Sequence, residues 1–146
     1  MKILLDTNIW VHAYNKSSPN QKPAATIIKK AIQGEIDACL TSQVLYELFA
    51  VITNPKRVEN PLPTKEAAEL CIDLWECNEI EKINPSGVAP LEVFKLAQSL
   101  KLCRAEVFDC NLAVTAKENS VDAIYTENVA DFKHYSFVKT VNPFEK

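Results

Sequence analysis

The sequence predicts a single α/β domain in which helices cover a mostly parallel β-sheet. Its 146 residues, 47% of them hydrophobic, are enough for one compact core. Short apolar runs alternate along the chain with longer segments of helical periodicity, which is typical of layered α/β domains. We find no internal repeat, linker or low-complexity tract, so one domain is expected to span residues 1–146.

The N-terminal part of the chain alternates strand and helix patterns. The apolar run KILL at residues 2–5 predicts a buried first strand, and a helix is expected to begin directly after it in NIWVHAY. Residues 24–32 repeat their apolar side chains at helical spacing, and Gly34 follows as a natural helix stop. The run DACL at 37–40 is the next predicted strand.

Two helices and a short strand are predicted in the middle of the chain. Residues 41–52 begin with Thr-Ser, carry one apolar face and are followed by the helix-ending Asn54-Pro55 pair. In the segment 61–75, Thr64 is the predicted cap of another amphipathic helix, whose apolar stripe runs from Ala67 to Trp75. The run IEKIN at 80–84 is consistent with a strand.

The C-terminal third is predicted to add two helices and two strands. Helical periodicity runs through residues 90–100 and again through 105–117. AIYT at 123–126 and FVKTV at 137–141 then read as the closing strands.

Composition narrows the possible functions. The formal net charge is −3, so no general positive field attracts nucleic acid, and a polyanion would have to be held at a local site. The apolar run at the N-terminus is too short for a signal peptide, and no run approaches a membrane span, so a soluble, cytoplasmic protein is expected. Five cysteines without a C-x-x-C pair predict buried, reduced thiols.

Several common catalytic motifs are missing from the sequence. With only two glycines, Gly34 and Gly87, the chain cannot build a Walker loop or a dinucleotide fingerprint. It has no G-x-S-x-G motif, and His12 and His134 occupy no spacing typical of metal ligands. Carboxylates therefore remain as the main candidates for chemistry.

Three carboxylates stand at informative positions. Asp6 directly follows the first strand, where parallel sheets bind ligands, although it could simply cap the next helix. Glu47 lies beside the apolar arc of its helix, as an exposed boundary glutamate also would. Asp109 shares a helical face with apolar residues and has no partner of opposite charge there. Because an unpaired buried carboxylate is costly, a metal ion would resolve its position.

A fourth acidic or amide side chain follows the strand at 123–126. The chain turns there through Asn128 toward Asp131. Because the ends of parallel strands meet at one edge of a sheet, we expect these side chains to gather with the other three. Oxygen ligands without histidine or thiolate favour Mg²⁺ or Mn²⁺ over zinc, and such sites serve mostly phosphoryl chemistry.

Four segments together resemble the PIN-domain family, and especially the VapC-type toxin ribonucleases. They are LLDTNIW, SQVLYELFAV, VFDCNLAVTA and IYTENVADF. Their order and spacing cover essentially the whole chain. The resemblance implies a three-layer α/β/α sandwich around a parallel sheet, whose acidic edge binds Mg²⁺ or Mn²⁺ and hydrolyses phosphodiester bonds of RNA.

The resemblance also implies roles for individual residues. Asp6, Glu47 and Asp109 match the first three acidic residues of the family. The fourth falls on Asn128, where many members have Asp, with Asp131 three residues later. The side chains implied to brace these carboxylates by hydrogen bonds are Thr7, Asn8 and Thr126.

Partners and alternatives follow from the same resemblance. VapC-type toxins usually form homodimers through helices, and a cognate antitoxin inhibits them by laying its tail across the acidic groove. Trp10, Tyr46 and Trp75 are candidates for such contact surfaces, although core packing is the competing expectation for each. A PIN nuclease in RNA processing and a catalytically silent RNA- or protein-binding domain remain the alternatives.

Two rival folds also place an aspartate after the first strand. A haloacid-dehalogenase-like phosphatase needs a second Asp two positions later, where this chain has Asn8. A receiver domain needs an early acidic dipeptide and a phosphoacceptor on a middle strand, and neither occurs.

Overall fold

A five-stranded parallel sheet forms the centre of the molecule. The computed structural model describes residues 1–145, so Lys146 of the predicted domain lies outside the description. The strand order is β3-β2-β1-β4-β5. All four neighbouring pairs are parallel, so the sheet is parallel throughout. The strands are β1 (Lys2–Leu5), β2 (Asp37–Leu40), β3 (Glu81–Lys82), β4 (Ala123–Tyr125) and β5 (Lys139–Val141).

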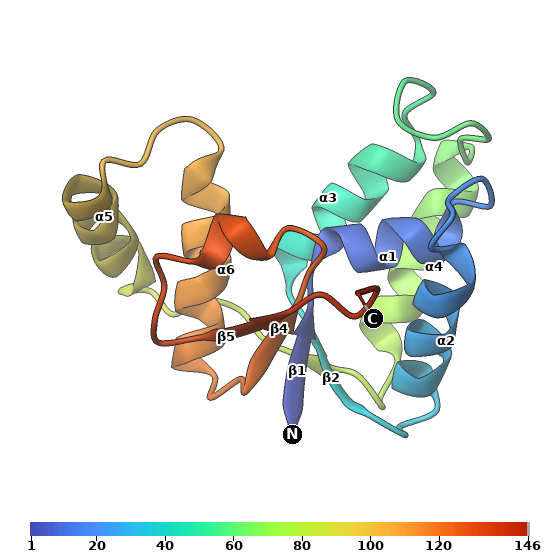
Figure 1. Ribbon diagram of the computed structural model, residues 1–146. Coiled ribbons are helices and arrows are strands. Elements are labelled where there is room, and N and C mark those ends of the chain that lie inside the picture. The colour runs from blue at the N-terminus through green and yellow to red at the C-terminus, as the bar shows by residue number, and fades with distance from the viewer. Residues whose placement is uncertain (146) are drawn as a thin grey trace.

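Helices cover both faces of this sheet. Figure 1 shows α5 and α6 on one side and α1 to α4 on the other, which confirms the predicted three-layer α/β/α architecture. A 3₁₀-helix, η1, follows β4. The helices are α1 (Thr7–Tyr14), α2 (Gln21–Ile32), α3 (Ser42–Ile52), α4 (Thr64–Glu76), α5 (Ala89–Leu100), α6 (Glu106–Glu118) and η1 (Val129–Phe132).

Local sequence explains how the elements begin and end. Asp6 caps α1, and Thr41 caps α3 by accepting a hydrogen bond from the Val44 amide at 3.0 Å. Gly34, with φ +73°, follows α2 in the left-handed region that glycine adopts without strain. The predicted helix stop there is confirmed.

Some local predictions are wrong. Pro63 rather than Thr64 occupies the cap position of α4, and Thr64 is the first helical residue, since a proline with extended backbone already ends the preceding segment. All five cysteines are free, as predicted, but only Cys39 and Cys110 are buried. Cys71 and Cys77 are half-buried, and Cys103 is exposed because it lies on the loop between α5 and α6. No helix in residues 1–145 combines the length and the apolar character needed to cross a bilayer.

The core lies where α1 and α3 pack on the central strands. Leu4 on β1 is flanked in register by Cys39 and Ile124, and all three are fully buried. Trp10 is also fully buried, and its indole N–H donates to the Leu5 carbonyl at 3.1 Å, so this side chain belongs to the core and not to a partner surface. This packing fixes the junction between β1 and α1 on which Asp6 stands.

Candidate active site

Two neighbouring strands deliver polar side chains to the same edge of the sheet. Leu5 pairs with Tyr125 in the parallel register, so the residues that follow them, Asp6 and Thr126, stand side by side. The Asp6 amide continues this ladder by donating to the Tyr125 carbonyl at 3.0 Å. β1 has β2 on one side and β4 on the other, which is the switch point where open parallel sheets bind ligands.

Asp6 is held by three donors. One carboxylate oxygen accepts from the Thr7 amide at 2.7 Å, and the other accepts from the Thr126 hydroxyl at 2.8 Å and the Asn8 side-chain amide at 3.4 Å. Burial raises the pKa of Asp6, the hydrogen bonds from Thr126 and Thr7 lower it, and nearby carboxylates raise it again, with a net increase. The cap of α1 is therefore also a fixed, partly buried carboxylate.

Glu47 extends from α3 toward Thr7 and lines the same pocket as Asp6. Its carboxylate accepts from the Thr7 hydroxyl at 3.0 Å and from the Gln43 side-chain amide at 2.9 Å. The Gln43 amide also donates to the Phe108 carbonyl at 3.3 Å, and its oxygen accepts from Asn111 at 2.6 Å. These bonds join α3 to α6 beside Glu47.

Asp109 lies in the first turn of α6 and has no partner. No hydrogen bond or ion pair within residues 1–145 reaches its carboxylate, although the side chain is half-buried. Its pKa rises from the ordinary 3.8 to about 6, chiefly through burial and then through the negative charges of Asp6, Asp131, Glu47 and Glu106. The sequence predicted a carboxylate directed into the core, whereas the side chain lies at the boundary, where it faces other acids.

The turn after β4 separates the two candidates for the fourth position. The backbone N–H of Asn128 donates to the Thr126 hydroxyl at 3.1 Å, and Asn128 lines the same pocket as Asp6. Asp131 lies in η1 and is exposed outside that lining. Its negative charge still raises the pKa values of Asp6 and Asp109, so it lies within electrostatic range of both.

One pocket of about 560 Å³ brings the three main carboxylates together. Besides Asp6, Glu47 and Asp109, its lining includes the side chains of Arg57 and His12. His12 is already engaged, with its ring nitrogens 2.5 Å from the Ser18 hydroxyl and 2.8 Å from a Glu127 carboxylate oxygen. Arg57 has no side-chain hydrogen bond or ion pair in the described part of the chain, so its guanidinium does not neutralise the acids.

The chemistry of this pocket fits a hard divalent cation. Asp6, Glu47 and Asp109 offer only oxygen atoms, which suit Mg²⁺ or Mn²⁺. The raised pKa of Asp109 also marks negative charge that lacks a counter-ion. Across residues 1–145 no three acidic, histidine or cysteine side chains already stand close enough to hold an ion. Water ligands, which Mg²⁺ commonly retains, would have to complete its coordination.

Comparisons with known proteins identify the family of this chain. The model of the PIN domain family matches residues 3–138. Ribonuclease VapC24 of Mycobacterium tuberculosis is 31% identical over 139 residues, covering 95% of this chain and 94% of that protein. The chain belongs to the PIN domain family. Its likeness to VapC24 extends over nearly the full length of both sequences.

Several solved structures share the fold. The sarcin–ricin-loop-cleaving toxin VapC20 of M. tuberculosis superposes with a TM-score of 0.70 at 12% identity, covering 94% of this PIN domain and 98% of that chain. A toxin–antitoxin complex from Klebsiella pneumoniae gives 0.64 at 17% identity, covering 99% and 100%. At these identities the likeness concerns the fold alone.

Sequence reasoning missed two amides in this PIN domain. Gln43 and Asn111 link the helices that carry Glu47 and Asp109. Gln43 lies one turn before Glu47 on the same helical face, and Asn111 lies two residues after Asp109, so each had a local signal. No sequence signal indicated the hydrogen bond between them, because it depends on how α3 packs beside α6.

Proposed function

We propose that this PIN domain is a metal-dependent endoribonuclease that hydrolyses phosphodiester bonds of RNA with Mg²⁺ or Mn²⁺. Asp109 carries the proposal, because it is an unpaired carboxylate with a pKa of about 6 beside Asp6 and Glu47. Such a site is costly without a cation and stable with one. The similarity to a protein named Ribonuclease VapC24 supports RNA as the substrate.

Each carboxylate has a distinct task in this proposal. Asp6 and Asp109 would hold the ion, and Glu47 would orient water molecules around it. A bound divalent ion supplies a lowered water pKa and neutralises charge at phosphorus. Thr126 and Asn8 fix the rotamer of Asp6 through the hydrogen bonds described above, which keeps its oxygen atoms directed at the pocket.

The fourth position is divided between two residues. Asn128, on the pocket wall, would act through a water molecule or brace Asp6, while Asp131 would add negative charge to a weaker or second ion position. We expect Asp131→Asn to need clearly more Mg²⁺ for half-maximal activity, and Asn128→Asp to keep activity while binding the ion more tightly. If Asp131→Asn matches the wild type at every Mg²⁺ concentration, the site has three acidic members.

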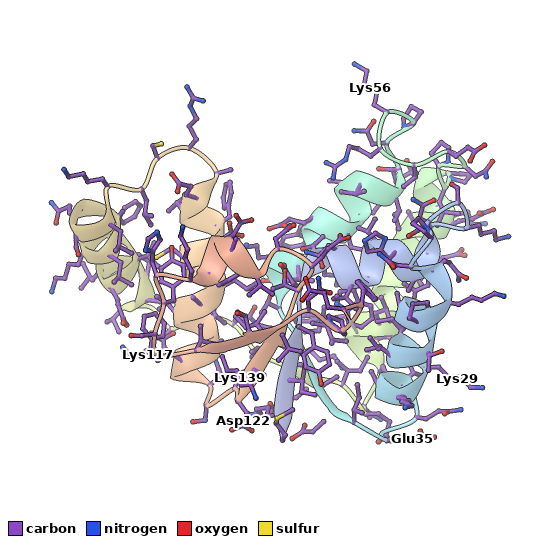
Figure 2. The ribbon with its side chains drawn as sticks, in the orientation of Figure 1. Lys29, Glu35, Lys56, Lys117, Asp122 and Lys139 are labelled. Atoms are coloured by element: carbon purple, nitrogen blue, oxygen red, sulfur yellow. The ribbon has the colours of Figure 1, made fainter. Side chains whose placement is uncertain are left out.

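Arg57 is a candidate phosphate contact at this acidic site. The side chain lines the pocket without pairing to any carboxylate, so its fork of donors remains available to an RNA phosphate. The neighbouring Lys56 points away from the body of the protein on the loop between α3 and α4 (Figure 2). An ion on the carboxylates together with Arg57 would let an acidic protein hold a polyanion.

Cleavage of single-stranded RNA tests the proposed activity. The purified protein is incubated with a labelled oligonucleotide in Mg²⁺ or Mn²⁺, with and without chelator, beside Asp6→Asn and Asp109→Asn. We expect cleavage that chelator and either substitution abolish. Asp73→Asn, on the exposed face of α4, is the control that should retain activity. Cleavage that persists in chelator would refute the mechanism, and RNA binding without cleavage would favour the silent alternative.

We also propose that the protein is the toxin of a toxin–antitoxin pair and forms a homodimer. The likeness to the VapC24 ribonuclease and to a toxin–antitoxin complex supports the toxin role. The homodimer rests on the resemblance to VapC-type toxins, which usually pair through helices. Expression alone should arrest growth, and Asp6→Asn or co-expression of the protein encoded beside it should relieve the arrest. A strict monomer in light scattering at micromolar concentration would refute the dimer.

A further inference from the structure

A second pocket adjoins the carboxylates, and its lining does not include His12. Its volume is about 500 Å³, within the range of small-ligand sites. Glu47 and Asp109 line both this pocket and the first one. A molecule that occupies the second pocket is therefore in reach of the group that the carboxylates act on.

Two exposed aromatic rings line this second pocket. Tyr46 is 73% exposed and Phe108 is 55% exposed. Tyr46 directly precedes Glu47 on α3, and Phe108 directly precedes Asp109 on α6. Consecutive residues of a helix point about 100° apart, so each helix directs a carboxylate to the sheet edge and a ring to the pocket beside it. Exposed aromatic side chains gathered at a concave site indicate a ligand.

The polar groups of the pocket are fixed in place. Asn111 donates to the Gln43 oxygen at 2.6 Å, and Gln43 donates to Glu47 at 2.9 Å and to the Phe108 carbonyl at 3.3 Å. These bonds engage both ends of the Gln43 amide. Within residues 1–145 no hydrogen bond engages the side-chain oxygen of Asn111, so it can accept one from a ligand.

We propose that this pocket binds one nucleobase of single-stranded RNA, next to the phosphate held at the carboxylates. The inference rests on the proposed nuclease function and adds a subsite to it. Unstacked bases bind proteins by stacking on aromatic side chains and by hydrogen bonds to their edges. Tyr46 and Phe108 provide the stacking surfaces, and the Asn111 oxygen accepts from an exocyclic amine. The base contact would thus restrict which nucleotide is presented for cleavage.

A second copy of the chain fits this pocket less well. Without a bound ion, a symmetric contact here would bring Glu47 and Asp109 of two copies into one interface, where like charges repel. A neutral heterocycle avoids that repulsion, and the phosphate attached to it requires the cation that the carboxylates attract. The amide oxygen of Asn111 also suits an edge that donates hydrogen bonds.

An abasic scan tests the base contact. Single-stranded RNA oligonucleotides in which one nucleotide at a time lacks its base are cleaved by the wild type, Tyr46→Ala, Phe108→Ala and Phe94→Ala. Phe94 is a matched control because it is 62% exposed on α5, outside the pocket. We expect the wild type to lose about tenfold in kcat/KM at one position beside the cleaved bond, the effect of one stacked base. Phe94→Ala should show the same loss.

The pocket variants should behave differently. Tyr46→Ala and Phe108→Ala should raise KM for the complete RNA and show a much smaller abasic loss, because the contact is already absent. An undiminished loss in both variants, or no sensitive position in the wild type, would overturn the proposal. So would conversion of a dimer to a monomer by either substitution with the abasic loss retained, since the rings would then belong to an interface between copies.

A binding assay separates this inference from the proposed function. Fluorescence anisotropy of the same oligonucleotides reports the base contact without turnover. If the wild type cleaves no RNA but still binds the complete RNA about tenfold more tightly than one abasic form, the nuclease proposal fails and the base site stands. If cleavage occurs and no abasic position affects cleavage or binding, the nuclease proposal stands and the base site fails.

Discussion

Replacing Asp109 by asparagine should stabilise the metal-free protein at neutral pH. The carboxyl pKa rises from 3.8 to about 6 on folding, so the folded state binds its proton more tightly than the unfolded state does. The carboxylate therefore contributes no penalty well below pH 4, lowers the free energy of unfolding as pH rises through 4 to 6, and holds that penalty above pH 6. Asparagine carries no charge, so the variant does not lose this stability as pH rises.

The size of this effect follows from the pKa difference. A difference of about two in pKa corresponds to about 3 kcal/mol. The side chain is half-exposed and solvent screens its interactions, so we reduce this to about 1 to 1.5 kcal/mol. Asp109→Asn should exceed the wild type by that amount at pH 7 without metal, and by much less at pH 4.5.

Urea unfolding in chelator at the two pH values measures this difference. Comparing the two proteins at each pH cancels the titration of the groups that do not interact with position 109. Asp73→Asn on α4 should show no pH-dependent gain. Added Mg²⁺ should reverse the order, because only the wild type retains the full ligand set and gains stability from the ion. Equal stability of Asp109→Asn and wild type at pH 7 in chelator would refute the assignment of unpaired charge.

Three further substitutions test other parts of the site. Arg57→Gln should raise KM for RNA and reduce the slope of log binding constant against log salt concentration by about 0.7, the contribution of one single-strand phosphate. Lys56→Gln should change neither quantity. Equal effects of the two substitutions would reject the phosphate contact. Thr126→Val removes a hydrogen bond that lowers the pKa of Asp6, so the Mg²⁺ needed for half-maximal cleavage should rise more at pH 5.5 than at pH 8. Thr41→Ala should cost about 1 kcal/mol in urea unfolding through the lost cap of α3, and an unchanged midpoint would show that the cap is dispensable.

Most of the fold could be predicted from the sequence because the local patterns of strands and helices match the elements that form the sheet and its covering layers. The apolar run of β1 ends at the cap of α1, and Gly34 follows α2. The end of β1 and the end of α2 could therefore both be predicted from the sequence. β3 was predicted over five residues and forms only Glu81–Lys82, because an edge strand of a sheet has a neighbour on one side only. The predicted Thr64 cap failed where the neighbouring proline already sets the backbone.

The sequence predicted which residues belong to the candidate site but not how they are arranged in space. Asp6, Glu47 and Asp109 were expected to gather at one edge of the sheet, and all three line one pocket. The half-exposure of Asp109 depends on how far α6 lies from α3, which no periodicity encodes. The bond between Gln43 and Asn111, 68 positions apart, is likewise set by tertiary packing alone.

The pairing of β1 with β4 also affects when activity can arise during synthesis. Ile3 lies beside Ala123, and the Asp6 carboxylate is fixed by Thr126, so the beginning of the chain waits for a segment translated 120 positions later. A nascent chain that ends before β4 lacks Thr126 and therefore the hydrogen bond that fixes Asp6. A premature stop codon before β4 would remove the same support. If the protein is the nuclease proposed above, this order would keep it inert until β4 has been translated and has paired with β1.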